Sequence, residues 1–219
     1  YEALYFAIFP DLAVYDNVAW AAYSTMEFTT EESQKKYGRY TRHIELLRVN
    51  PTGADTNFER KVFSTYNYGY GPEGEESLSY GRSVRPAVFA DATGVQLAYI
   101  GFDGDTNENG LIEETETPTS GVYHVASTDD GDTFTEPVAL AADGVLSNAG
   151  LDFSRSGDLD FAVLTDSGTV EVCRFDGSTT SCQDTGSEAI DGLTALGGET
   201  LASLRDSSTG RWTVTSFSW

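Results

Sequence analysis

One plan of short strands recurs along this chain, and it constrains the fold more than any other feature. The segments FPDLAVYDNVAWAAYS (9–24) and VRPAVFADATGVQLAYIG (84–101) each predict a short strand, a turn and a longer apolar strand. A polar insertion and two further strands follow in each unit: RHIELLRV (42–49) and RKVFST (60–65), then GVYHVAST (121–128) and EPVAL (136–140). Helical periodicity is nearly absent, so we expect an all-β protein.

Two later segments repeat the plan. NAGLDFSRSGDLDFAVLTDSGTVEVCRF (148–175) lacks the insertion, and LTALGGETLASLRDSSTGRWTVTSFSW (193–219) stops after its third strand. The uninterrupted spacing, from Gly150 to Leu193, matches one four-stranded propeller blade. Repeats of this size favour a small β-propeller, with a β-sandwich as the alternative.

The incomplete last unit suggests a way to close the ring. YEALYFAIF (1–9) precedes the first unit as a spare strand, and pairing it with the last unit would remove two bare sheet edges. We therefore expect one domain, 1–219, of four blades closed by the N-terminal strand. Its expected blades are 9–68, 83–140, 147–190, and 191–219 together with 1–8. A fragment of a larger ring is the alternative.

The charge limits the partners. The net charge is −22, with 35 acidic residues in 219. Such a surface repels phosphate backbones and anionic lipid, so we expect neither nucleic-acid binding nor direct membrane insertion. A marine or halophilic source and a secreted acidic protein would both explain this balance.

The two cysteines lie in GTVEVCRFDGSTTSCQD. Cys173 and Cys182 flank a turn-rich segment as if facing each other across a hairpin. A disulfide there would close a loop of about ten residues, worth roughly 2.5–3 kcal/mol in the chain-entropy model. It would indicate an oxidising location: extracellular, periplasmic or on the cell surface. Two free thiols are the alternative.

The segment DTNENGLIEETE (105–116) predicts a calcium site. Oxygen-bearing side chains stand at loop positions one, three and five, a glycine at six, and a carboxylate at twelve, as in an EF-hand loop. No helices flank it, so no sensor switch is expected, and a solvated acidic loop is the alternative. The expected calcium ligands are Asp105, Asn107, Asn109, the carbonyl of Leu111, Glu113 and Glu116.

The segment STDDGDTF (127–134) fits the pattern Ser-x-Asp-x-Gly-x-x-aromatic. With this motif the chain resembles the Asp-box, or bacterial-neuraminidase-repeat, propellers, in which the motif forms the turn between the third and fourth strands of a blade. The resemblance implies a structural role for Ser127, Asp129, Gly131 and Phe134. Asp129 can accept backbone N–H bonds within the turn, and Gly131 can adopt a left-handed conformation.

The same resemblance raises sialidase chemistry. Sialidases of this family are six-bladed and use three arginines, a Tyr–Glu nucleophile pair and an acid/base residue. VRPAV (84–88) is distantly similar to the family's Arg-x-Pro element, which would involve Arg85. The other arginines and the Tyr–Glu pair cannot be assigned, so we expect no catalytic residues. A sialidase-like glycosidase remains an alternative function.

Two segments suggest binding. TYNYGYGPEGEESLSYG (65–81) could present Tyr66, Tyr68, Tyr70 and Tyr80 in a loop to a sugar or protein, or these rings could pack on the propeller. MEFTTEESQKKYGRY (26–40) could be a short helix or flap, at the same point of its unit as the calcium-like loop. The sequence therefore predicts a non-catalytic, calcium-stabilised module that binds a protein or structures an assembly, with a lectin-like propeller as an alternative.

Overall fold

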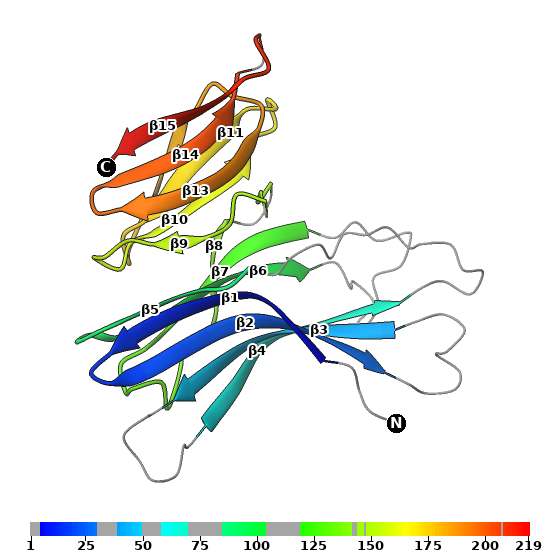
Figure 1. Cartoon of the computed structure of the whole chain (residues 1–219), viewed down its shortest axis with the longest axis vertical. Helices are drawn as coiled ribbons and strands as arrows, with labels where there is room; N and C mark the ends of the chain where they lie inside the picture. The colour runs from blue at the N-terminus through cyan, green and yellow to red at the C-terminus, as the bar shows by residue number, and fades with distance from the viewer. Residues whose placement is uncertain are drawn as a thin grey trace.

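We describe the protein from a computed structural model. The ranges that the structure describes are 5–29, 39–49, 58–69, 85–103, 119–141, 144–146, 148–206 and 208–219. These residues form an all-β fold of four antiparallel sheets, arranged as the four blades of a small β-propeller (Figure 1). The predicted fold class is confirmed.

Each sheet is a simple meander, in which strands follow one another in chain order. We number the sheets blades 1 to 4. Blade 1 contains β1 (Tyr5–Tyr15), β2 (Val18–Thr29), β3 (Arg39–Val49) and β4 (Phe58–Gly69). Blade 2 contains β5 (Ala87–Asp91), β6 (Gly94–Asp103), β7 (Thr119–Ser127) and β8 (Val138–Ala141). Blade 3 contains β9 (Asp152–Phe153), β10 (Leu159–Leu164), β11 (Val170–Phe175) and β12 (Thr180–Asp184). Blade 4 contains β13 (Ile190–Leu196), β14 (Glu199–Arg205) and β15 (Trp212–Ser218).

Three apolar cores join the blades in chain order. The first packs Trp20 and Ile44 of blade 1 on Leu97 and Tyr99 of blade 2. The second lies between blades 2 and 3, and the third lies between blades 3 and 4. Burying apolar side chains in these joints supplies the main driving force for the arrangement.

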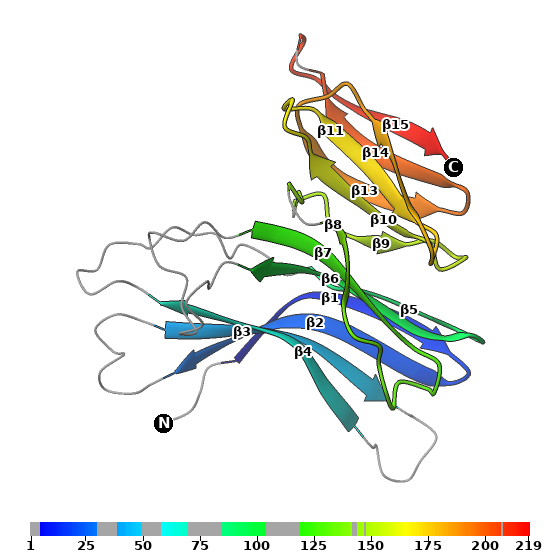
Figure 2. The ribbon, with the colours of Figure 1, turned by 180° about the vertical axis from the view of Figure 1, so that it is seen from behind.

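The burial of individual strands shows which blades are interior. β10 of blade 3 begins with four successive buried residues, Leu159–Ala162, so both faces of that blade are covered. β14 of blade 4 instead alternates buried and more exposed residues, because only one face is covered. Blade 1 likewise leaves Leu12 and Val14 exposed on its outer face. Figures 1 and 2 show blades 1 and 4 at opposite ends of the molecule.

The predicted closure by the N-terminal strand is wrong for the residues that the structure describes there. Tyr5–Ile8 pair with residues 24–27 of β2 and not with blade 4, whose sheet has three strands in the described part of the chain. The spare N-terminal segment and the predicted first strand form one continuous strand, β1, because β2 is long enough to pair with both. A bulge between Ile8 and Asp11 contains Pro10, which has no N–H to give to the ladder.

The two predicted binding segments also begin as strands. Phe28 and Thr29 pair with Tyr40 and Arg39, so the described ends of the 26–40 insertion extend the β2–β3 hairpin. Tyr66 and Tyr68 lie in β4, and their placement in a loop is therefore wrong. The reason is the length of β3, which offers backbone partners as far as Arg39.

Candidate functional site

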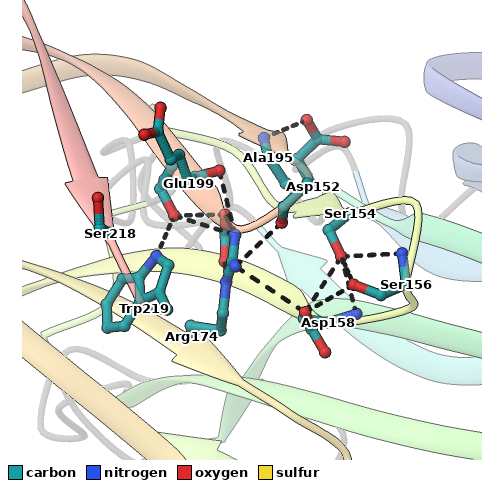
Figure 3. Close-up of polar contacts among 12 residues, drawn as sticks. Asp152, Ser154, Ser156, Asp158, Arg174, Ala195, Glu199, Ser218 and Trp219 are labelled. Carbon is teal, nitrogen blue, oxygen red and sulfur yellow. Dashed lines mark hydrogen bonds and ion pairs between the residues drawn. The ribbon is translucent and has the colours of Figure 1, made fainter.

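A buried ion pair forms the centre of a polar cluster in blade 3 (Figure 3). Asp160 of β10 and Arg174 of β11 lie directly opposite each other. The guanidinium donates from Nε to Asp160 Oδ1 at 2.7 Å and from Nη2 to Oδ2 at 2.9 Å. Asp160 is 0% exposed and Arg174 is 5% exposed. Such a bidentate bond fixes both side chains within the contact between blades 3 and 4.

The rest of the cluster comes from blade 4. Arg174 also donates to the backbone carbonyls of Gly197 at 3.1 Å and Glu199 at 3.2 Å. The Thr200 hydroxyl donates to Asp160 Oδ2 at 2.5 Å and accepts the indole N–H of Trp219 at 2.7 Å. The guanidinium lies 5.5 Å from the centre of the Trp219 ring, within reach of a cation–π contact. The cluster thus joins two blades with its own hydrogen bonds.

Burial and the partner's charge both shift the pKa values of Asp160 and Arg174. The hydrogen bonds that Arg174 donates to Asp160 are the largest influence on the pKa of Arg174 and raise it. Burial raises the pKa of Asp160, whereas the bonds from Arg174 and Thr200 act in the opposite direction. With both carboxylate oxygens and the guanidinium already paired, the arrangement is suited to holding blades together.

A neighbouring turn extends the cluster toward the surface. Ser154 Oγ accepts the backbone N–H groups of Ser156 and Asp158, at 3.2 and 3.1 Å. Ser156 Oγ donates to Asp158 Oδ2 at 2.8 Å. That same carboxylate oxygen lies 3.8 Å from Arg174 Nη1. The turn therefore places a second carboxylate beside the buried guanidinium.

Aspartates on the first strand of a blade bond to the next blade. Asp152 of β9 accepts the Thr194 hydroxyl at 2.7 Å and the Ala195 N–H at 2.9 Å, both from β13. Asp11 of β1 accepts the Val88 N–H of β5 at 2.7 Å. Both carboxylates satisfy a backbone donor across a blade contact. Their positions identify them as structural links.

The turn at 127–134 is held by hydrogen bonds of the Ser127 and Asp129 side chains. Ser127 Oγ donates to Asp129 Oδ1 at 2.7 Å and accepts the Gly131 N–H at 2.8 Å. Asp129 also accepts the Thr133 N–H at 2.9 Å, and Gly131 has a φ of 81°. These bonds, chiefly those from Thr133, lower the pKa of Asp129 to about 2. The turn connects β7 and β8, the third and fourth strands of blade 2.

This turn rests on blade 1. Gly131 lies against the Trp20 ring so closely that an added Cβ would fall 2.5 Å from it. The Phe134 ring meets Phe63 edge-on, with centroids 4.9 Å apart. The Arg48 guanidinium lies 5.3 Å from the Trp20 ring centre, and its Nη1 is 3.4 Å from Asp132 Oδ1. The turn is thus part of the joint between blades 1 and 2.

A second buried carboxylate lies in blade 1. Glu45 of β3 is 2% exposed; it accepts the Thr25 hydroxyl at 3.2 Å and forms an ion pair with Arg60. Burial and the bond with Glu45 raise the pKa of Tyr23. Like the Asp160 carboxylate, the Glu45 carboxylate is bonded to neighbouring side chains of the same blade or an adjacent one.

His124 is the buried titratable group of the joint between blades 2 and 3. Its Nε2 is 3.0 Å from Gln96 Oε1, and its ring lies 5.2 Å from that of Phe175. Burial lowers its pKa below the ordinary value of 6.5. No serine or cysteine bonds to it among the described contacts, so its role is packing with one polar partner.

The predicted disulfide is confirmed. Cys173 of β11 and Cys182 of β12 are direct cross-strand partners and are joined by a disulfide. In the described part of the chain, one group of potential metal ligands comes together, Glu171 with these two cysteines. Because both sulfurs are in the disulfide, the group offers no thiolate to a metal.

The predicted calcium loop lies outside the described residues. This applies to Asp105, Asn107, Asn109, Leu111, Glu113 and Glu116, and also to Tyr70 and Tyr80. The described strand ends beside these segments, however, lie on one side of the molecule in both views (Figures 1 and 2). They are the ends of β2, β4 and β6 and the starts of β3 and β7.

The sequence analysis missed the Asp160–Arg174 cluster. A signal was present: Asp160 is the one charged residue of the strand LDFAVL, and Arg174 follows Val172 and Cys173 in the strand VEVCRF. A charged residue within a strand buried on both faces requires a partner. The two are 14 positions apart in sequence. Their cross-strand register was needed to pair them.

Comparisons with known proteins identify no family for this chain. No protein-family model matches the chain, and no curated protein sequence matches it. Among solved structures, one titled "NanB plus Optactamide" aligns with a TM-score of 0.46 and 9% sequence identity. The alignment covers 97% of this chain and 51% of that chain, so this chain spans about half the length of its neighbour. No helix among the described residues is long and apolar enough to cross a membrane.

Proposed function

We propose that this chain is a non-catalytic, calcium-stabilised propeller module that works outside the cell, as a protein-binding or structural subunit of a larger assembly. We take 1–219 as one domain. The observation that carries the proposal is the common side on which the ends of β2, β4 and β6 lie (Figure 1). The calcium-like loop, the tyrosine segment and the 26–40 insertion all leave from that side, which supports a shared contact surface.

Other observations support the separate parts of the proposal. The Ser127 and Asp129 hydrogen bonds agree with an Asp-box turn whose role is structural. The Cys173–Cys182 disulfide agrees with an oxidising compartment. The buried carboxylates among the described residues, Asp160 and Glu45, each form an ion pair with an arginine of the same chain. This favours a scaffold role over acid/base chemistry.

Calcium would be held by the loop at 105–116. Six hard oxygen donors in EF-hand spacing suit Ca²⁺, and the two asparagines lower the ligand charge. This favours a weak site, filled in calcium-rich extracellular fluid. Binding would order the loop beside the tyrosine segment and so stabilise the contact surface.

Calcium titration tests this proposal. Isothermal calorimetry on the whole chain should give saturable binding, and calcium should raise the melting temperature and slow proteolysis near residues 103–120. The paired change Asp105→Ala and Glu116→Ala should remove all three responses. Asp166→Ala, an exposed aspartate in the turn between β10 and β11, is the matched control. Absence of saturable binding at millimolar calcium would contradict the calcium assignment.

The function itself is tested with calcium-loaded protein. Co-purification from the native source should yield a protein partner that is released by chelator. Selective binding on a glycan array would instead favour the lectin-like reading, with Tyr66, Tyr68, Tyr70 and Tyr80 as the residues to change. Turnover of a fluorogenic sialoside would favour the sialidase-like reading and overturn the non-catalytic one.

A further inference from the structure

The disulfide of blade 3 joins a buried sulfur to an exposed one. Cys173 of β11 is 1% exposed and packs in the apolar core between blades 2 and 3. Cys182 of β12 is exposed. Thiol–disulfide exchange requires a thiolate to reach one of the two sulfurs. A reductant in solution can therefore reach Cys182, whereas the core shields Cys173.

The strand β12 contributes nothing to the apolar cores. Its sequence, TSCQD, is polar apart from the cysteine, and none of its five residues is buried. In the part of the chain that the structure describes, β12 pairs with β11 alone. Gln183 Nε2 also donates to the Ser218 carbonyl of β15 at 2.9 Å. A segment held by its backbone ladder, with few buried apolar contacts, is typical of those that open locally.

Two like charges face each other next to the disulfide. Glu171 of β11 and Asp184 of β12 are direct cross-strand partners, two positions along each strand from the paired cysteines. Glu171 also places a carboxylate oxygen within 4.8 Å of both sulfurs. Like charges directly opposite each other on a ladder oppose its pairing. The covalent bond between the cysteines holds β12 in place against this repulsion.

Hydrogen bonds fix the chain on both sides of β12. Before the strand, the Asp176 carboxylate accepts two backbone N–H groups of its own turn, at 2.9 and 2.8 Å. After it, Thr185 Oγ1 donates to the Val170 carbonyl at 2.7 Å. These bonds do not involve residues 180–184. They can therefore persist when that segment leaves β11.

We propose that the disulfide is a redox switch for β12: its reduction by a dithiol frees residues 180–184 from β11 while the blades stay folded. One thiolate of the reductant attacks Cys182 Sγ, the S–S bond breaks, and Cys173 leaves as a thiolate that takes up a proton. The second thiol of the reductant attacks the reductant's own sulfur in the mixed disulfide and releases Cys182 as a thiol. The protein disulfide is thus reduced to two thiols, and the dithiol is oxidised to a disulfide.

Opening of β12 uncovers the backbone edge of β11. It also breaks the bond between Gln183 and Ser218, so reduction loosens a link between blades 3 and 4. In an oxidising fluid the bond stays closed, and a dithiol oxidoreductase or a reducing compartment opens it. The switch does not involve the segments proposed to bind calcium. Its failure would therefore leave the proposed function unaffected.

Hydrogen exchange of the whole chain, with and without dithiothreitol, tests the proposal. In the oxidised chain, the amides of 180–184 that bond to β11 should be protected. In the reduced chain they should exchange at nearly the rate of an unfolded peptide, at least about a hundredfold faster than the amides of β10. Retained protection at 180–184 would overturn the proposal. Loss of protection in β10 as well would also overturn it, because reduction would then unfold the blade.

The variant Glu171→Gln tests the role of the facing carboxylates. Removing one of the two charges should slow exchange at 180–184 in the reduced chain about twofold or more. Glu136→Gln, an exposed change in blade 2, is the matched control and should leave that exchange as it is in the native chain. Equal rates in both variants would show that the repulsion does not drive the opening.

Two single-cysteine variants test the point of attack. Cys182 in the Cys173→Ser chain should react with an aromatic disulfide reagent at least about tenfold faster than Cys173 in the Cys182→Ser chain, because the core shields Cys173. Melting curves would verify that both variants stay folded. Equal rates, or a faster reaction at Cys173, would overturn Cys182 as the sulfur that a reductant attacks.

Discussion

Arg174 and Asp160 lie opposite each other on neighbouring strands of blade 3 and bind through two parallel hydrogen bonds inside the contact with blade 4. Removal of one partner would leave the other charge buried. We expect Arg174→Met to lower the free energy of unfolding by about 3–5 kcal/mol. Urea denaturation at pH 7 measures the loss.

Two further variants make this result specific. Arg155→Met changes an exposed arginine in the nearby β9–β10 turn and should have little effect. Adding Asp160→Leu to Arg174→Met should recover much of the lost stability, because no unpaired charge then remains. If the double variant were less stable than Arg174→Met alone, the buried charge would not be the cause.

Substitution of Gly131 tests the packing of the 127–134 turn against the Trp20 ring. Both Gly131 and Gly168 have left-handed backbones, with φ of 81° and 83°, but only Gly131 has an aromatic ring at its Cβ position. Alanine should cost about 1–2 kcal/mol at either site from backbone strain. At Gly131 we expect about 1–3 kcal/mol more, because Trp20 must move. Equal losses in thermal denaturation would argue against the close contact.

The disulfide provides a third prediction. Its cysteines are nine positions apart, and reduction should lower the free energy of unfolding by roughly 2.5–3 kcal/mol in the chain-entropy model. Denaturation with and without a reductant measures this loss. The double variant Cys173→Ala, Cys182→Ala should be insensitive to the reductant. Labelling of both thiols in the native, unreduced protein would contradict the disulfide.

Local sequence patterns predicted much of the fold. The strand of NAGLDFSRSGDLDFAVL around Phe161 and its hairpin partner around Val172 are apolar runs between glycine turns, and both formed as expected. The Cys173–Cys182 pair was predictable because one hairpin sets its register. The turn at Ser127 was predictable because its bonds are local.

What the sequence could not predict depends on competition between distant partners. Residues 5–8 could pair with the last blade or continue along β2, and both choices suit their apolar character. The length of β2 decides between them. Tyr66 and Tyr68 were misplaced for a similar reason, because β3 extends back to Arg39 and so offers backbone partners along the whole of β4. The Asp160–Arg174 pair required the register of two strands and the approach of a third, β14.

His124 predicts how stability changes with pH. Burial lowers its pKa in the folded protein below 6.5, the value expected for the unfolded chain. Between these two values the unfolded state binds more protons than the folded state, so protons favour unfolding. The contribution of His124 is therefore present above pH 6.5 and is lost as the pH falls toward the folded pKa. Urea denaturation between pH 7.5 and 5 should show this decline.

The variant His124→Gln isolates the effect. Glutamine cannot titrate here but can still bond to Gln96, so the decline from pH 7.5 to 5 should be smaller than in the native chain. The carboxylates that protonate at lower pH are common to both proteins and cancel in the comparison. Identical slopes in the native chain and His124→Gln would show that His124 does not titrate as a buried group.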